Sequence, residues 1–184
     1  MRPLRQLQLI CFDFGDTLAD EGTEIKDQTG VTLEAKLIPG AADVVRALKA
    51  RGYPLALVAD GLRGTYVNVL SHYGLWDLFD AAAISEEVGV EKPDARMFRT
   101  ALDQLGIPKE HYGRTVMVGN NLERDIRGAN MLGMVSVWLD WAPRRSKVPE
   151  DAIEVPDYTI KLPLELMEII QQLENNFLTD SKMG

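Results

Sequence analysis

Hydrophobic residues along the chain follow two alternating patterns. Short, continuously apolar runs lie at residues 7–12, 54–59, 81–84, 115–118 and 135–139, with a shorter one at 158–160. Continuous hydrophobicity, rather than strict alternation with polar residues, is typical of strands that are covered on both faces. The runs therefore predict a mostly parallel sheet with helices on each side.

The segments between these runs carry hydrophobic residues at helical spacing. The predicted helices lie at residues 41–51, 64–73, 94–105, 122–132 and 164–177. The first four are each followed directly by a glycine, a residue that commonly ends helices. Repeated strand–helix order predicts an α/β fold of three layers around a doubly wound, mostly parallel sheet.

The chain length and one irregular segment suggest the domain organisation. A length of 184 residues suits one domain with a substantial core. We expect a single core domain over residues 1–177 and a tail without stable structure at 178–184. Residues 19–39 are polar, contain glycines and lack clear periodicity, so we expect them to form at most a β-hairpin flap beside the first strand.

Charge and composition exclude several classes of function. The formal net charge of −8 argues against a nucleic-acid or anionic-membrane binder, although a metal ion and a lysine can still attract an anionic substrate locally. No apolar run approaches membrane-spanning length, and Gln6 and Gln8 interrupt the first one, so we expect no signal peptide and a cytoplasmic location. The lone Cys11 predicts a buried structural thiol, and two distant histidines give little support for a zinc site.

Polar residues follow the predicted strands, where ligands bind in sheets of this type. They are Asp13, Asp16, Asp60, Gly61, Lys92, Asn120 and Asp125. Any one acid after a strand is weak evidence, because such residues often only form turns or helix caps. Acid, lysine and acid at successive strand ends are a stronger signal. Carboxylates that meet at one sheet edge repel unless a cation lies between them, so the pattern predicts a Mg²⁺ site with a lysine beside it.

Four segments resemble, in order, the motifs of the haloacid dehalogenase (HAD) superfamily of hydrolases. Residues 9–18 (LICFDFGDTL) resemble its first motif, and residues 38–52 resemble the helix before its second motif. Residues 88–94 (VGVEKPD) resemble the lysine motif, and residues 116–134 resemble the final acidic motif with its helix. The resemblance spans nearly the whole chain and implies a HAD-like Rossmannoid core.

The resemblance implies a role for each matching residue. Asp13 matches the nucleophile that becomes an aspartyl-phosphate, and it is also a metal ligand. Lys92 matches the lysine that neutralises the charge of the nucleophile and the phosphoryl group. Asp125 matches an acid that holds Mg²⁺, and Gly15 matches a position whose backbone carbonyl contacts the metal.

Three further residues complete the predicted site. Asp60 and Gly61 stand at the second motif, and Asn120 precedes a predicted helix start, where backbone N–H groups favour anions. We expect these three residues to contact a small phosphorylated substrate. Arg63 and Arg124 are weaker candidates for substrate contact, because a solvated surface role is the favoured explanation for both.

Three positions depart from the family pattern. Gly15 stands where the family has its acid/base aspartate, Ala59 replaces a hydroxyl residue, and Asn120 replaces the first acid of the final motif. General acid–base help is worth about 10²–10⁴-fold, so its loss affects alkyl phosphate esters most, since their leaving groups need a proton. Asp16 is the candidate replacement from one position further on. The alternative is that Asp16 is only a turn residue.

These observations leave two main hypotheses and a weaker third. The first is a Mg²⁺-dependent HAD-like phosphohydrolase without a full cap domain, because the gaps after the first and second motifs are too short to hold one. The second is a catalytically reduced HAD-fold protein that binds a phosphorylated ligand or partner. A phosphoacceptor receiver domain is the third, but it needs adjacent acids after the first strand. Capless family members cover the site by oligomerisation or act on large substrates, so a homo-oligomer is a further expectation by analogy.

Overall fold

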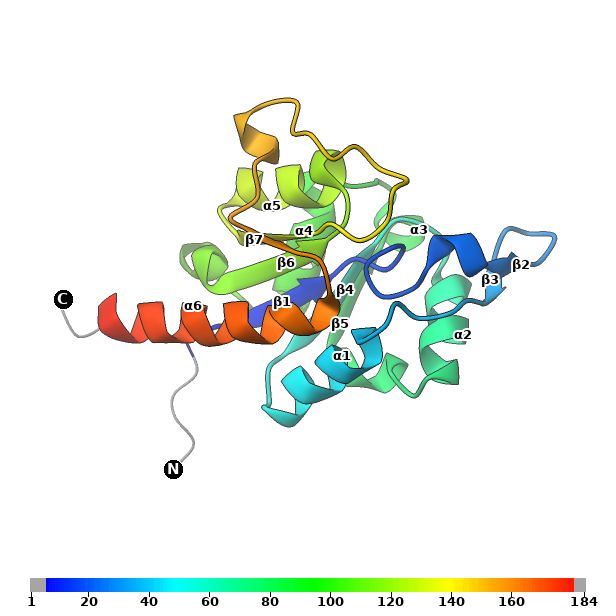
Figure 1. Ribbon diagram of the computed structural model, residues 1–184, viewed down its shortest axis with the longest axis horizontal. Coiled ribbons are helices and arrows are strands. Elements are labelled where there is room, and N and C mark those ends of the chain that lie inside the picture. Colours follow the sequence, from blue (N-terminus) through cyan, green and yellow to red (C-terminus); the bar gives the residue numbers. More distant parts are fainter. Residues whose placement is uncertain (1–5, 181–184) are drawn as a thin grey trace.

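Six parallel strands form one sheet in the computed structural model, which describes residues 6–180 (Figure 1). The strands are β1 (Leu9–Phe12), β4 (Leu55–Ala59), β5 (Ala81–Ile84), β6 (Thr115–Gly119), β7 (Val135–Leu139) and β8 (Tyr158–Ile160). Across the sheet their order is β5-β4-β1-β6-β7-β8, and each neighbouring pair is parallel. The predicted parallel sheet is therefore confirmed, with β1 between β4 and β6.

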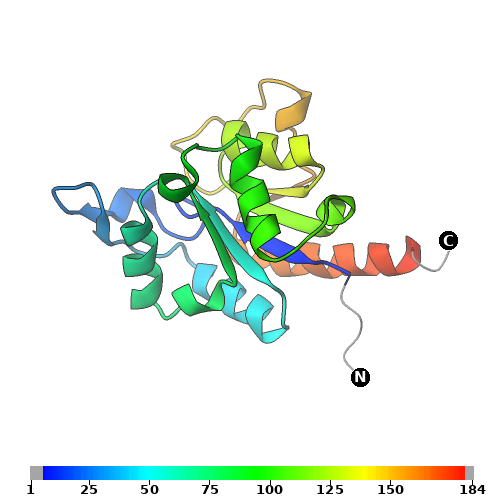
Figure 2. The same cartoon turned by 180° about the vertical axis from the view of Figure 1, so that it is seen from behind.

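Helices cover both faces of the sheet, as Figures 1 and 2 show from opposite sides. On one face lie α1 (Ala41–Ala50), α2 (Arg63–His72) and α6 (Leu166–Asp180); on the other lie α4 (Ala95–Gln104) and α5 (Arg127–Leu132). A short helix, α3 (Ser85–Val88), follows β5. Alternate residues of β1 reach the two cores, Ile10 and Phe12 on one side and Leu9 and Cys11 on the other. The continuous hydrophobicity of this strand is thus explained by burial on both faces. No helix within residues 6–180 is long and apolar enough to cross a bilayer.

Two predicted helices differ from the observed ones. The segment predicted at 122–132 begins with a π-helical turn, Leu122–Ile126, before α5. The last helix continues to Asp180, so residues 178–180, which we expected in the tail, are helical. Within this helix Glu174 contacts the core, because its buried carboxylate accepts hydrogen bonds from Leu7 N and the Tyr53 hydroxyl. The rest of the expected tail, 181–184, lies outside the described residues.

The segment at 19–39 contains a two-stranded antiparallel hairpin, β2 (Ile25–Lys26) and β3 (Thr32–Glu34), preceded by a 3₁₀ turn. We call residues 19–39 the flap. Its hairpin packs on α2, because Thr32 N donates to Thr65 Oγ1 at 2.9 Å and Asn68 Nδ2 donates to Thr32 O at 3.1 Å. The hairpin projects at one end of the molecule in both ribbon views. Within residues 6–180 no full cap domain accompanies it.

The contact between α4 and α5 depends on Gly128. A Cβ atom at this position would lie 2.2 Å from two atoms of the Phe98 ring, which is fully buried. Gly128→Ala should therefore lower the free energy of unfolding by about 1–3 kcal/mol, the usual cost of overpacking a core. Gly113→Ala is the matched control, because its Cβ would meet only Gly133 O, at 3.6 Å. Chemical denaturation of both variants checks this, and equal midpoints would contradict it.

Cys11 lies in β1 with its side chain completely buried. Burial raises the pKa of the thiol to about 12. The reactive species is the thiolate, so at about pH 8 we expect iodoacetamide to leave the native protein unmodified and to label Cys11 once denaturant unfolds the chain. Mass spectrometry of both samples measures this, and rapid labelling under native conditions would show that the strand opens locally.

Candidate active site

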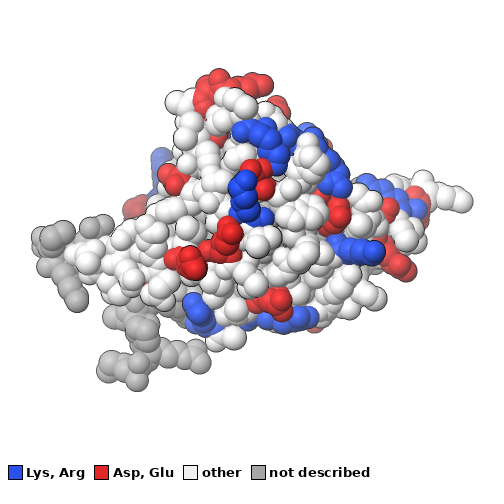
Figure 3. All heavy atoms as spheres, viewed as in Figure 1, with Lys and Arg blue, Asp and Glu red and all other residues white. Residues whose placement is uncertain are grey.

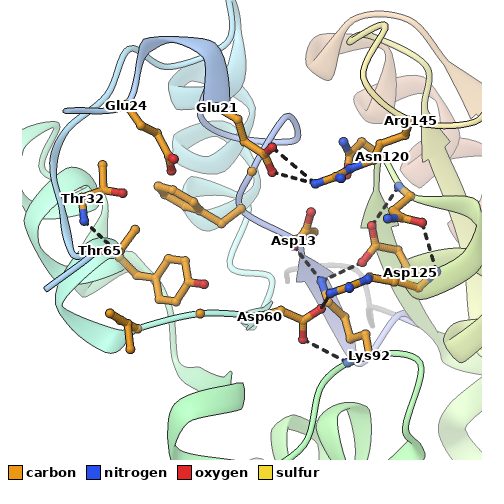
Figure 4. A pocket seen from close by; sticks show the side chains of 18 of the residues that line it. Asp13, Glu21, Glu24, Thr32, Asp60, Thr65, Lys92, Asn120, Asp125 and Arg145 are labelled. Atoms are coloured by element: carbon orange, nitrogen blue, oxygen red, sulfur yellow. Dashed lines mark hydrogen bonds and ion pairs between the residues drawn. The ribbon is translucent and has the colours of Figure 1, made fainter. Parts of the chain in front are cut away.

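All the predicted site residues except Asp16 line a cavity at the carboxyl ends of β1, β4 and β6, beside the flap (Figure 4). Its volume is about 270 Å³. The predicted residues that line it are Asp13, Gly15, Asp60, Gly61, Lys92, Asn120 and Asp125. Parallel strands end at one edge of a sheet, and for this reason residues distant in the chain meet here.

Lys92 connects the two acids of the predicted motif. Its Nζ donates to Asp13 Oδ1 at 2.6 Å, to Asp125 Oδ1 at 2.7 Å and to Val58 O at 2.9 Å, and the residue is only 4% exposed. Burial alone would lower the pKa of the ammonium group, but the carboxylates of Asp125 and Asp13 outweigh it and raise the pKa. Lys92 is therefore a fixed positive charge beside Asp13.

Asp125 owes its position to the π-helical turn after β6. Asn121 N donates to Asp125 Oδ2 at 3.0 Å, and the Asn121 side chain caps the turn by accepting from the backbone N–H groups of Glu123 and Arg124. Gly119 permits the close approach, since a Cβ there would lie 2.3 Å from Asp125 Cγ. Burial raises the pKa of the Asp125 carboxyl, and the nearby charge of Asp13 raises it further, while Lys92 opposes both.

This donor set fits a Mg²⁺ ion. The carboxylates of Asp13 and Asp125 are held by one ammonium group, so two acids face a single positive charge. A cation between them would offset the remaining negative charge, and Mg²⁺ commonly takes one or two carboxylates with water and substrate oxygens as its other ligands. Among residues 6–180 no group of three or more acid, histidine or cysteine side chains is arranged around a metal position. The site thus fits a metal completed by water and substrate, not an all-protein cage.

Residues directly after β4 hold the loop that carries Lys92. Asp60 Oδ1 accepts from Lys92 N at 3.0 Å, and Asp60 Oδ2 accepts from Arg124 Nη1 at 3.0 Å. Arg124 also pairs with Glu91 at 3.1 Å. Gly61 N donates to Ser85 Oγ at 2.8 Å. Asp60 and Gly61 line the cavity, and their contact with a substrate stays a prediction. Asp60 already binds protein groups through both carboxylate oxygens.

Asn120 has an available hydrogen-bond donor. The residue is buried and lines the cavity, and its backbone oxygen accepts from Trp138 Nε1 at 2.9 Å. The side-chain Nδ2 has no hydrogen-bond partner within the described residues. A buried donor without a partner costs free energy, so an acceptor oxygen of a ligand would be stabilised at this point.

Asp16 does not occupy the position that we predicted for a replacement acid. It has a left-handed backbone, with φ of 51°, and its side chain is fully buried and does not line the cavity. Asp16 Oδ1 accepts from Glu21 N at 3.1 Å, and both oxygens bind Arg144, at 3.1 and 3.2 Å. We therefore revise this prediction: a carboxylate that is held by Arg144 away from the cavity is a structural group of the loop.

Four charged residues that line the cavity were not predicted from the sequence: Glu21, Glu24, Lys26 and Arg145. Glu21 comes from the flap, and Arg145 from the loop after β7; they face each other in Figure 4, with Arg145 Nη2 3.3 Å from both Glu21 oxygens. Basic side chains gather around this loop on the face shown in Figure 3. Burial raises the pKa of the Glu21 carboxyl, and Arg145 opposes that shift. The sequence did not indicate Glu21 or Arg145 as site residues, because they are far apart in the chain and neither belongs to a motif that follows a strand.

The fold and the acid–lysine–acid site define an α/β protein of the HAD type. A sequence model of the family described as haloacid dehalogenase-like hydrolase matches residues 18–133, and the chain belongs to this family. The chain is 35% identical over 138 residues to the glyceraldehyde 3-phosphate phosphatase of Methanopyrus kandleri, covering 75% of this chain and 58% of that protein. It is 37% identical over 124 residues to the phosphoserine phosphatase of Thermus thermophilus, covering 67% of this chain and 47% of that protein. The chain thus spans about half the length of these curated relatives.

Solved structures agree with the fold. The HAD phosphatase from Thermococcus onnurineus matches with a TM-score of 0.72 at 20% identity, covering 89% of this chain and 98% of that chain. A predicted phosphoglycolate phosphatase from Haemophilus somnus also matches with a TM-score of 0.72, at 19% identity, covering 90% of this chain and 99% of that chain. At these identities the likeness establishes the fold alone.

Proposed function

We propose that this protein is a Mg²⁺-dependent phosphatase that hydrolyses small phosphate monoesters through an aspartyl-phosphate on Asp13. The observation that carries the proposal is the Lys92 Nζ, which binds both Asp13 and Asp125 at the edge of the cavity. In this proposal Asp13 is the nucleophile, Lys92 the fixed positive charge and Asp125 the second acid around one phosphoryl group. Phosphoryl transfer depends mostly on positioning and on charge neutralisation, and these residues supply both.

Each residue has a defined task in this proposal. Asp13 attacks phosphorus through a carboxylate oxygen, and Lys92 stabilises the negative charge of the phosphoryl oxygens during transfer. Asn120 Nδ2 donates to a phosphoryl oxygen. Asp13 and Asp125 would hold Mg²⁺, which when bound supplies further charge neutralisation of the phosphoryl group. A contact from the Gly15 carbonyl to the metal remains a prediction.

The cavity favours small substrates. Its volume of about 270 Å³ lies near the lower end of ligand pockets, which usually enclose about 300–1,000 Å³. The relatives named above are phosphatases of glyceraldehyde 3-phosphate and phosphoserine, both small phosphate monoesters. We extend the same substrate class to this chain.

Phosphate release from a panel of phosphorylated compounds tests the proposal. The panel consists of acetyl phosphate, para-nitrophenyl phosphate, phosphoserine and glyceraldehyde 3-phosphate, each with Mg²⁺ and with EDTA. Release that needs Mg²⁺ and is lost in Asp13→Asn supports the proposal. Mg²⁺-dependent release that survives in Asp13→Asn would overturn the assignment of the nucleophile.

A protein that binds a phosphorylated ligand without efficient turnover is the second candidate. The observation that favours it is the absence of a carboxylate side chain at Gly15. Its signature would be saturable binding of phosphoserine by calorimetry with no phosphate release from any member of the panel.

A further inference from the structure

We propose that Glu21 supplies the carboxyl group that position 15 lacks and acts as the proton donor and acceptor of the phosphatase reaction. The inference rests on the proposed function, because it assigns a residue to that reaction. It concerns a residue of the flap that the sequence motifs did not indicate.

The space next to Gly15 carries the inference. A Cβ atom built on Gly15 would lie 2.2 Å from Glu21 Oε1 and 2.9 Å from Glu21 Cδ, distances that real Cβ atoms essentially never show. The Glu21 carboxylate therefore occupies the volume in which a side chain at position 15 would begin. Glycine at this position leaves room for a carboxylate that arrives from six residues further along the chain.

The loop between β1 and the flap holds Glu21 at this point. Glu21 N donates to Asp16 Oδ1 at 3.1 Å, and Arg144 Nη1 also binds the Asp16 carboxylate, at 3.1 Å from the same oxygen. Asp20 caps the 3₁₀ turn that begins at Glu21 by accepting from Gly22 N at 2.9 Å. We therefore infer that the buried carboxylate of Asp16 is a positioning group, which holds the backbone of Glu21 in place.

The ion pair of Glu21 is compatible with proton transfer. Arg145 Nη2 lies 3.3 Å from both carboxylate oxygens, which is long for a charge-assisted hydrogen bond. The Arg145 side chain is 43% exposed and the Glu21 side chain 30% exposed, and ion pairs with this much exposure to solvent are weak. The carboxylate can therefore exchange Arg145 for a ligand atom inside the cavity.

The reaction with Glu21 balances in two steps. Asp13 attacks phosphorus, the bond from phosphorus to the ester oxygen breaks, and that oxygen takes its electron pair and the proton of the Glu21 carboxyl to leave as an alcohol. The Glu21 carboxylate then takes a proton from water as the water oxygen attacks the phosphorus of the aspartyl-phosphate. The bond from phosphorus to Asp13 breaks, its electrons return to the carboxylate, and phosphate leaves with Glu21 protonated again.

The test compares leaving groups in Glu21→Gln. We expect kcat/KM for phosphoserine, whose alkoxide needs a proton, to fall about 10²–10⁴-fold, the usual worth of general acid catalysis. For para-nitrophenyl phosphate, whose leaving group needs no proton, kcat/KM should change less than about 10-fold, while the second step slows. Rapid mixing should then show a burst of nitrophenolate near one equivalent, with phosphorylated Asp13 detected by mass spectrometry after acid quenching.

Glu34→Gln is the matched control, because Glu34 lies on the flap, is exposed and does not line the cavity.

A double variant that moves the carboxylate from position 21 to position 15 provides a second test. In Glu21→Ala the space beside residue 15 opens, so Gly15→Asp combined with Glu21→Ala should recover phosphoserine turnover relative to Glu21→Ala alone. Thermal melting followed by circular dichroism verifies that each variant is folded. A folded double variant without any recovery would contradict the claim that the two positions share one volume.

The outcomes separate this inference from the proposed function. A wild-type protein with no Mg²⁺-dependent phosphate release overturns the proposed function and the role of Glu21 with it. Wild-type release that is lost in Asp13→Asn, together with equal losses for both esters or none in Glu21→Gln, overturns the role of Glu21 alone.

Discussion

Asp13→Asn should lower Mg²⁺-dependent phosphate release by at least about 10⁴-fold, because an amide oxygen cannot replace the attacking carboxylate and the covalent route is lost. The fold should persist, since asparagine has nearly the same shape and Lys92 keeps Asp125 as a partner at 2.7 Å. Steady-state phosphate release and thermal melting measure the two effects.

Asp103→Asn is the control for Asp13→Asn. Asp103 is exposed on α4 and does not line the cavity, so the same chemical change there should leave turnover unaltered. An Asp13→Asn protein that retains a tenth or more of wild-type activity would show that another group attacks phosphorus.

Lys92→Met should have the second large effect, because it should lower both the stability of the fold and the turnover. The methionine fills the volume but leaves the Asp13 and Asp125 carboxylates facing each other without the ammonium group that now binds both. We expect the free energy of unfolding, measured in EDTA, to fall by about 3–5 kcal/mol, the usual cost of removing one partner from a buried ion pair. Turnover of para-nitrophenyl phosphate should fall at least about 10²-fold, because transition-state charge loses its stabilising partner.

Two variants test the cause of the Lys92→Met effect. Lys161→Met removes an ammonium group that is 76% exposed and should change stability by less than about 0.5 kcal/mol. Adding Asp125→Asn to Lys92→Met removes one of the opposed carboxylates, so it should recover part of the lost stability but none of the activity. A Lys92→Met protein as stable as the wild type in EDTA would show that the two carboxylates do not repel in the folded state.

The sheet and most of its helices were predictable because hydrophobic spacing is a local property. The runs predicted at residues 81–84, 135–139 and 158–160 match β5, β7 and β8. The ends of α1, α4 and α5 were close to their predicted positions, since each is followed within two residues by a glycine. The π-helical turn was missed because it consists of backbone hydrogen bonds, such as Ile126 N donating to Asn121 O at 3.2 Å, which the hydrophobic pattern does not record.

For the site, the sequence by itself predicted that Asp13 and Asp125 would meet, because they follow β1 and β6, which end at one edge of the sheet. Lys92 lies beyond α3, and the tertiary contact of its backbone N–H with Asp60 helps to bring its loop to the same edge. Only the tertiary structure decided which carboxylate lies beside Gly15. Arg144 draws Asp16 out of the cavity, and Glu21 enters the space from the flap. Arg144 is 128 residues from Asp16 in the chain, and the direction of a loop side chain depends on such distant partners, whereas the end of a buried strand is marked in the local hydrophobic pattern.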